Sequence, residues 1–283
     1  MMNMRRNRKV SPIRIFILIA GLCVILIPII WLLFRLISGN TEPESQPAPE
    51  PVVIESFYDL DSFVKDENGI IRYDNPDYRS IIGIDVSTFN HEIDWGAVAS
   101  DEVVEFAMIR AGYRGAIEGL LHTDDQFYNN IEGAVSNGLP VGIYWYSSGI
   151  TEDEINEEVD YLLSLLEPYP ISYPVVFDME PYEADENGGR ISTMSQDEKT
   201  QMALLFCQRI RDAGYTPMVY GNLSWLYDNL NFEQLVDIDI WYAGYQSKPS
   251  MYDEFRMWQF SNAGSIDGID NGVDLNLYLE KNS

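Results

Sequence analysis

Residues 174–180 read PVVFDME, an apolar run that ends in two carboxylates. The run is short and rich in Val and Phe, which is the composition of a strand buried on both faces. Asp178 and Glu180 are two positions apart, so on a strand their side chains point to the same face. Buried carboxylates are costly unless they serve a purpose, and the end of this strand is therefore a candidate functional site.

Seven further apolar runs of similar length accompany this strand. The predicted strands cover residues 81–86, 104–110, 140–146, 173–179, 216–221, 238–243, 255–260 and 271–276. Helical patterns between them predict helices over 124–137, 152–166 and 195–213, each of which ends before a Gly or a Pro. The last strands are linked by shorter segments, so we expect the final third to be less regular.

Strands that alternate with helices indicate an α/β protein, here a (β/α)8 TIM-like barrel. A doubly wound open sheet is the alternative fold. The segment after the first predicted strand has no Gly-rich phosphate loop, which weakens the nucleotide-binding version of that alternative.

The active site of such a barrel forms at the carboxyl ends of its strands. These ends carry four carboxylates, Asp85, Asp178, Glu180 and Asp274. They also carry a group of candidate substrate-binding residues, Arg110, Tyr144, Tyr146, Tyr220, Trp241, Tyr242, Trp258 and Gln259. Aromatic faces bind sugar rings, and paired carboxylates act as acid and base at a glycosidic bond. A single acid at a strand end is often only a helix cap, and a single aromatic residue is often part of the hydrophobic core. The hypothesis of a sugar-cleaving site therefore depends on the combination of the carboxylates with the aromatic residues.

The charge of the chain is strongly negative and unevenly distributed. The formal net charge is -27, yet residues 1–37 hold six of the 18 basic residues and no acidic residue, which leaves 12 bases against 45 acids. This excess argues against nucleic acid or another polyanion as a partner and favours a neutral substrate such as a sugar. Two cysteines and two histidines without ligand spacing give no candidate metal site.

The N-terminal part predicts a membrane anchor. Residues 15–34 contain no charged side chain and are long enough to span a bilayer as a helix. Most bases precede this run, so the basic tail (1–14) is predicted to be cytoplasmic, with a transmembrane signal anchor (15–37) and the remainder outside the cell membrane. A cleaved signal peptide is the alternative. A Pro- and Glu-rich linker (38–56) follows, and then a lead-in (57–80) that either packs as a strap or continues the tether.

Several stretches of residues 81–280 resemble glycoside hydrolase family 25, the Chalaropsis-type lysozymes. They are GIDVSTFNHEIDW from residue 83, FAMIRAGYRG at 106–115, GIYWYSS at 142–148, PVVFDME at 174–180, and WQF at 258–260 with GVDLN at 272–276. The resemblance implies a modified (β/α)8 barrel over 81–283, without cofactor, that cleaves the β-1,4 bond between N-acetylmuramic acid and N-acetylglucosamine in peptidoglycan. We expect a monomeric catalytic domain.

The resemblance also implies roles for individual residues. Glu180 corresponds to the general acid and Asp178 to the residue that assists the acetamido group of the substrate. Asp85 and Asp274 correspond to carboxylates that orient or stabilise, and Tyr144 to a contact with the reacting sugar. Trp145 replaces a His found in many members, and strand alternation predicts that it faces the helices, as a packing change.

Two alternative functions stay open at this point. The same barrel could be a non-catalytic glycan-binding or assembly protein, because fold alone does not fix function. It could also hydrolyse a different acetamido-sugar polymer.

Overall fold

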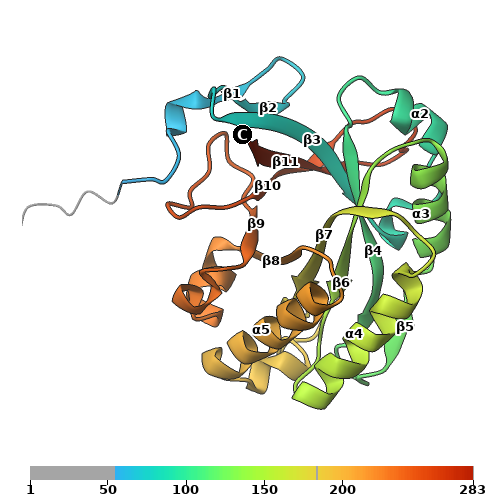
Figure 1. Ribbon diagram of the computed structural model, residues 1–283, viewed down its shortest axis with the longest axis vertical. Coiled ribbons are helices and arrows are strands. Elements are labelled where there is room, and N and C mark those ends of the chain that lie inside the picture. The colour runs from blue at the N-terminus through green and yellow to red at the C-terminus, as the bar shows by residue number, and fades with distance from the viewer. Residues whose placement is uncertain (1–54, 183, 283) are drawn as a thin grey trace, which may run out of the picture. The chain divides into compact units, whose positions relative to one another are not determined.

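The computed structural model describes residues 55–182 and 184–282. Eight strands close into a barrel in which each strand pairs with the next and the last pairs with the first (Figure 1). In barrel order they are β3 (Tyr78–Val86), β4 (Phe106–Arg114), β6 (Val141–Tyr146), β7 (Ile171–Asp178), β8 (Pro217–Asn222), β9 (Asp239–Ala243), β10 (Met257–Gly264) and β11 (Val273–Lys281). All eight predicted strands are present, and closure of the barrel rules out the doubly wound open sheet.

Strand β11 makes this barrel a modified one. It runs antiparallel to both of its neighbours, β10 and β3, whereas the other neighbouring barrel strands are parallel. An antiparallel strand brings its first residues, not its last, to the end of the barrel where the parallel strands finish. Asp274, near the start of β11, consequently lies directly opposite Asp85, near the end of β3.

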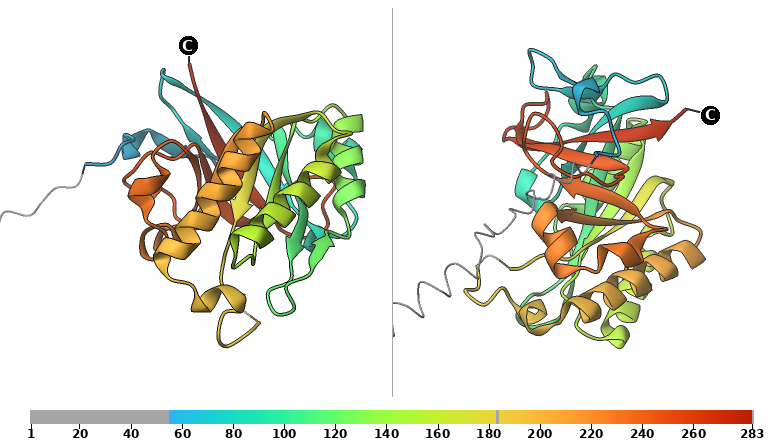
Figure 2. Two further views of the ribbon diagram at one scale, coloured as in Figure 1. Left: turned by 60° about the horizontal axis from the view of Figure 1, so that its bottom comes forward. Right: turned by 90° about the vertical axis from the view of Figure 1, so that its left-hand side faces the viewer.

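Helices cover the barrel beside its earlier strands (Figures 1 and 2). The described α-helices are α2 (Trp95–Ser100), α3 (Phe127–Ser136), α4 (Glu152–Leu166) and α5 (Gln196–Asp212). The hydroxyls of Thr151 and Ser195 cap the N-termini of α4 and α5 close to the predicted starts. Strand β5 (Leu121–Thr123) pairs with β4 before helix α3. Helix α3 starts later than predicted, because the backbone nitrogen of Asp124 donates to the oxygen of Ala111 and its side chain accepts from the backbone nitrogen of Gln126, which keeps residues 124–126 outside the helix.

The part of the barrel after β8 is less regular, as expected. In the described residues, only a π-helical turn (Trp225–Asn229) and a 3-10 turn (Phe232–Leu235) lie between β8 and β9, and no helix lies between β9 and β10. Residues 57–77 pack beside β10 instead (Figure 1). They form a 3-10 turn (Leu60–Ser62) and a hairpin of β1 (Phe63–Lys65) and β2 (Ile71–Tyr73).

Aromatic side chains attach this N-terminal strap, residues 57–77, to the barrel. The Tyr58 hydroxyl donates a hydrogen bond to the backbone oxygen of Phe255 at 2.5 Å. The ring of Phe63 meets the indole of Trp258 edge-on, with centroids 5.4 Å apart. The strap therefore supplies the apolar cover that helices supply elsewhere.

Side chains alternate between an inner and an outer core along the strands. The lower barrel interior is filled by Ile81, Phe106, Met108, Val176, Met218, Trp241 and Met257. Outward-facing residues join a larger core beneath the helices and the strap. Trp145 belongs to this outer core, with its ring 6.0 Å from that of Tyr161 on α4, as strand alternation predicts. The barrel interior is thus packed with apolar side chains, and polar side chains gather at the end where the parallel strands finish.

In the part of the chain that the structure describes, no helix has the length and apolar character needed to cross a membrane. The predicted tail (1–14), the predicted anchor (15–37) and nearly all of the predicted linker (38–56) lie outside the described residues. Those assignments stay predictions.

Candidate active site

A pocket of about 360 Å³ opens at the end of the barrel where the parallel strands finish. Its lining consists of Asp85, Ser87, Phe89, Asn90, Arg110, Tyr144, Tyr146, Asp178, Glu180, Tyr220, Trp241, Gln259, Gly272 and Asp274. The four predicted carboxylates are all present, together with six of the eight predicted binding residues. Ser87, Phe89, Asn90 and Gly272 were not predicted.

Tyr242 and Trp258 do not line the pocket, which corrects the sequence prediction for both. Tyr242 follows the pocket residue Trp241, and Trp258 precedes the pocket residue Gln259. Because side chains alternate along a strand, both point to the opposite face of the barrel wall. Both side chains are buried in the outer core. The indole nitrogen of Trp258 donates to the backbone oxygen of Gly244 at 2.7 Å. Their role is therefore packing beneath the pocket wall.

Asp178 and Glu180 lie at the end of β7 and share the pocket. Asp178 is buried, and burial first and the charge of Glu180 second raise its pKa well above the usual range, against a smaller opposing effect of Arg110. Among the described residues, Oδ1 of Asp178 has no hydrogen-bond partner. The Tyr146 hydroxyl donates to the backbone oxygen of Glu180 at 3.1 Å and so fixes the chain beyond the strand. Asp178 thus presents an unpartnered polar atom and keeps its proton to higher pH than an ordinary Asp.

Asp85 and Asp274 form a second carboxylate pair, across the β3–β11 seam. The Gln259 amide nitrogen donates to Oδ2 of Asp85 at 2.9 Å and to Oδ2 of Asp274 at 3.1 Å. The Asn276 amide also donates to Oδ2 of Asp85, at 2.8 Å, while its oxygen accepts from the Trp241 indole at 2.8 Å. Burial is the largest cause that raises the pKa of both carboxyls. The pair is therefore held in place by shared hydrogen bonds, and both carboxyls keep a proton to higher pH than an ordinary Asp.

Gln259 is the centre of this arrangement. Its amide oxygen accepts hydrogen bonds from the hydroxyls of Tyr220 at 3.0 Å and Tyr245 at 2.9 Å, while its nitrogen serves the two aspartates. These contacts use the two donor and two acceptor positions of a glutamine amide. Gln259, predicted as a substrate contact, is therefore better described as a residue that positions the groups around it. Tyr245 lies in the loop after β9 and was not predicted, because nothing in the sequence marks that loop.

Arg110 is the one cation among the pocket-lining residues. Its Nε and one terminal nitrogen each lie 2.8 Å from the same oxygen of Asp124, whose side chain is fully buried. The guanidinium lies over the ring of Phe89 at 5.0 Å and over that of Tyr113 at 5.7 Å. Its position in the pocket wall is consequently fixed from three sides.

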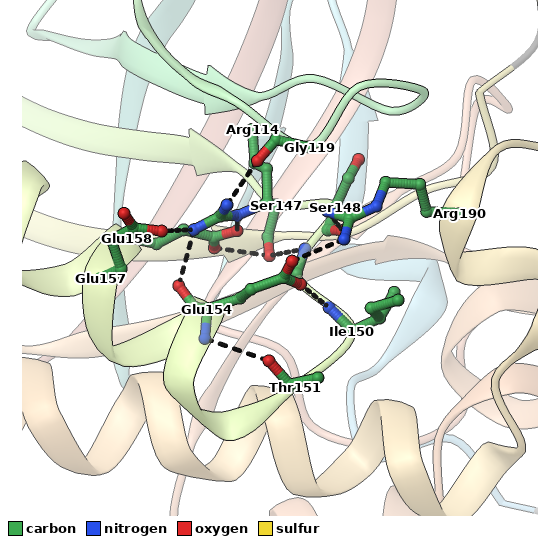
Figure 3. Close-up of polar contacts among 11 residues, drawn as sticks. Arg114, Gly119, Ser147, Ser148, Ile150, Thr151, Glu154, Glu157, Glu158 and Arg190 are labelled. Atoms are coloured by element: carbon green, nitrogen blue, oxygen red, sulfur yellow. Dashed lines mark hydrogen bonds and ion pairs between the residues drawn. The ribbon is translucent and has the colours of Figure 1, made fainter.

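A buried network of charges braces the strand that carries Asp178 (Figure 3). The Nε of Arg114 donates to one oxygen of Glu158 at 2.8 Å, and the Ser147 hydroxyl donates to the other at 2.7 Å. The backbone nitrogen of Ser147 in turn donates to the backbone oxygen of Asp178 at 2.7 Å. Burial is the main cause that raises the pKa of Glu158 to about 7.

The same network extends to the loop that follows Glu180. One terminal nitrogen of Arg190 pairs with Glu154 at 2.5 Å and the other donates to the backbone oxygen of Ser148 at 3.2 Å (Figure 3). The backbone nitrogen of Arg190 donates to the oxygen of Ala116 in the β4–β5 connection. The loops that follow β4, β6 and β7 are therefore joined to one another by charged side chains as well as by backbone hydrogen bonds.

Comparison with known families places this geometry in context. The model of the family described as glycosyl hydrolases family 25 matches residues 84–269. The chain belongs to glycosyl hydrolase family 25. The matched range contains Asp85, Asp178, Glu180 and Gln259, while Asp274 lies just beyond it.

Individual proteins are also similar to this chain in sequence or in fold. The autolytic lysozyme of Clostridium acetobutylicum is 26% identical over 201 residues, which cover 70% of this chain and 56% of that protein. The chain thus spans little more than half the length of that relative. The spore cortex lytic enzyme SleM of Clostridium perfringens has a similar fold, with a TM-score of 0.61, 22% identity, and coverage of 72% of this chain and 68% of that one.

A second solved structure shows the same fold. It is the modular autolysin LytC of Streptococcus pneumoniae in complex with a synthetic peptidoglycan ligand, with a TM-score of 0.60 and 23% identity. The likeness covers 71% of this chain and 47% of that one.

Proposed function

We propose that this family 25 domain hydrolyses peptidoglycan by cleaving the β-1,4 bond between N-acetylmuramic acid and N-acetylglucosamine. The observation that carries the proposal is the meeting of Asp178 and Glu180 with the buried Asp85–Asp274 pair in one aromatic-lined pocket. The lysozyme name of a relative and the peptidoglycan ligand of a structural neighbour support the same substrate class.

In the proposed reaction Glu180 is the general acid. It donates its proton to the glycosidic oxygen as the bond from that oxygen to the anomeric carbon breaks. The carbonyl oxygen of the substrate's own 2-acetamido group attacks the anomeric carbon and forms a cyclic intermediate. Water then opens this ring, giving its proton to the Glu180 carboxylate and restoring the acid.

Asp178 assists the acetamido group in this proposal. Its Oδ1 is buried and unpartnered among the described residues, and an amide N–H of the substrate is a suitable partner for such an atom. As positive charge develops on the acetamido group, Asp178 is the neighbouring carboxyl that stabilises it. Asp85 and Asp274 hold the opposite wall, and Tyr144 contacts the reacting sugar.

The test compares the chain with its Glu180→Gln variant on purified peptidoglycan. Products are reduced with borohydride and read by mass spectrometry, and new reducing ends on muramic acid identify a muramidase. Loss of general acid catalysis should lower turnover by about 10²- to 10⁴-fold. Glu186→Gln is the matched control, since Glu186 is an exposed acid outside the pocket lining. A Glu180→Gln variant with normal activity would remove the assignment of the acid.

Products from neither protein, with the domain shown to be folded, would favour one of the two alternatives. Binding of glycan strands without cleavage would indicate a non-catalytic wall-binding protein. Cleavage of soluble chitin oligomers without release of muropeptides would indicate another acetamido-sugar polymer as the substrate.

The proposal includes a location for the enzyme. The predicted anchor (15–37), with its uncharged run of residues 15–34, would hold the chain in the cell membrane, with the catalytic domain outside and close to the wall. A reporter fused to the C-terminus should then be degraded when protease is added to intact cells. Full protection of the reporter would refute this topology.

A further inference from the structure

Phe89 is a highly exposed aromatic side chain in the wall of the pocket. Its exposed fraction is 75%, although it belongs to the pocket lining. Exposure of a phenyl ring to water is unfavourable, but single exposed apolar residues are common on protein surfaces. Exposure alone therefore does not show that Phe89 binds a ligand. What matters is whether the surrounding residues hold the ring in a fixed position.

The loop that carries Phe89 is firmly held. It is a 3-10 turn (Thr88–Asn90) closed by reciprocal caps: the Ser87 hydroxyl accepts from the nitrogen of Phe89, and the Asn90 side chain accepts from the nitrogen of Ser87. The next residue, His91, has φ 59°, and within the described chain it is the one non-glycine residue with positive φ. Such a conformation costs energy and is kept where surrounding structure imposes it. The turn thus has a defined shape that points Phe89 outward.

The ring itself is supported from behind. The Arg110 guanidinium lies 5.0 Å from its centroid. The buried Asp124 carboxylate holds both parts of the support, since it accepts from Arg110 at 2.8 Å and from the backbone nitrogen of Thr88 at 3.1 Å. One carboxylate therefore fixes the loop and the group that backs the ring. The high exposure of Phe89 is then the exposure of a rigid ring, with one face occupied and the other available.

The chemistry of the surroundings selects the ligand. An aromatic face with a fixed orientation suits the apolar face of a sugar ring. Four carboxylates share the pocket with Phe89, so an anionic ligand is disfavoured there. We propose that Phe89 is the platform of a separate subsite that binds a neutral N-acetylhexosamine ring of the glycan strand, next to the sugars at the cleaved bond. The inference rests on the proposed function and deepens it.

The platform contributes to binding but not to the chemical step. Loss of an interaction that is equal in the ground state and the transition state raises KM and leaves kcat unchanged. We therefore expect Phe89→Ala to raise KM for peptidoglycan about tenfold with kcat nearly constant. Phe89→Trp, which keeps a flat ring, should restore KM. A purely structural role of Phe89 would not be rescued in this way.

Binding is measured separately from turnover by calorimetry with a defined tetrasaccharide of alternating N-acetylglucosamine and N-acetylmuramic acid. The full chain carrying Glu180→Gln is compared with the same chain carrying Phe89→Ala in addition, and we expect the Kd to rise about tenfold. Tyr128→Ala is the matched control, because Tyr128 is 51% exposed on α3 and outside the pocket lining, and it should leave the Kd unchanged. Thermal melting confirms that each variant is folded.

An unchanged Kd in Phe89→Ala, or equal loss in Phe89→Ala and Phe89→Trp, would overturn the subsite. If the chain without any substitution still releases reduced muropeptides, the proposed function survives that result. If the chain neither binds the tetrasaccharide nor releases products, both proposals fail together.

Discussion

Asp85 and Asp274 lie directly opposite one another across the seam between β3 and β11, and the single amide nitrogen of Gln259 donates to both. Two carboxylates this close ionise together only at a high cost in free energy. Burial first, and the charge of Asp85 second, raise the pKa of Asp274 to about 8. The pair therefore shares a proton at neutral pH.

This shared proton predicts how stability depends on pH. The pKa of Asp274 is about 8 in the folded chain and near the ordinary value of 3.8 when unfolded, so the folded state binds more protons between those limits. The free energy of unfolding should consequently fall as pH rises from about 4 to about 8. Asp274→Asn removes this contribution, and urea unfolding at several pH values should show a flatter decline. An identical decline in both proteins would contradict the shared proton.

The hydrogen bonds of Gln259 predict a second effect. Gln259→Met preserves the size of the side chain but removes both donors to the aspartates and both acceptor contacts to Tyr220 and Tyr245. Turnover should fall by about 10- to 100-fold, the effect of leaving buried polar groups unsatisfied. The apparent pKa values in the pH profile of kcat/KM should rise, because the amide N–H favours the ionised carboxylates. Gln201→Met, on the exposed face of α5, is the control. A loss of activity with no movement of the pH profile would indicate general disruption instead.

The buried ion pair beside β7 predicts a stability difference. Arg114→Met leaves Glu158 buried without its charged partner, which should lower the free energy of unfolding by about 3–5 kcal/mol. Arg209→Met removes the more exposed pair with Asp160 and should cost less than about 1 kcal/mol. Urea titrations of both variants measure the difference. Equal losses would show that burial does not distinguish the two pairs.

The N-terminal strap predicts a third pair of variants. Phe63 is buried against Trp258, so Phe63→Ala should destabilise the domain by about 3–5 kcal/mol through the cavity it leaves. Its neighbour Val64 is 53% exposed, and Val64→Ala should change stability little. Differential scanning calorimetry separates the two effects. A melting temperature unaffected by Phe63→Ala would mean that residues 57–77 behave as a tether and not as part of the core.

Much of the barrel could be predicted from local composition, because each buried strand is a short Val-, Ile- and aromatic-rich run. The direction of β11 could not, since a strand pattern has the same period whichever way the strand runs. Its antiparallel course became visible only through the pairing of Asp274 with Asp85. The strap was also ambiguous, because its strands β1 and β2 have three residues each.

The pocket could be predicted where strands supply it and not where loops do. Asp85, Asp178 and Trp241 follow from strand position. Tyr242 and Trp258 were placed wrongly, although period-two alternation on their own strands was sufficient to turn them outward. Phe89 and Tyr245 belong to loops whose shape depends on contacts with distant residues, such as that of Asp124 with Thr88.

The closing seam has a consequence for synthesis of the protein. Strand β11 pairs along β3 from Asp274 opposite Asp85 to Lys281 opposite Tyr78. On a ribosome, β3 emerges long before β11. The first strand of the barrel can therefore pair with β11 only after almost the whole domain has been translated. The same late segment delivers Asp274 and Asn276. A nascent chain therefore gains the β3–β11 pairing and Asp274 together, and a chain released before β11 is translated would have neither.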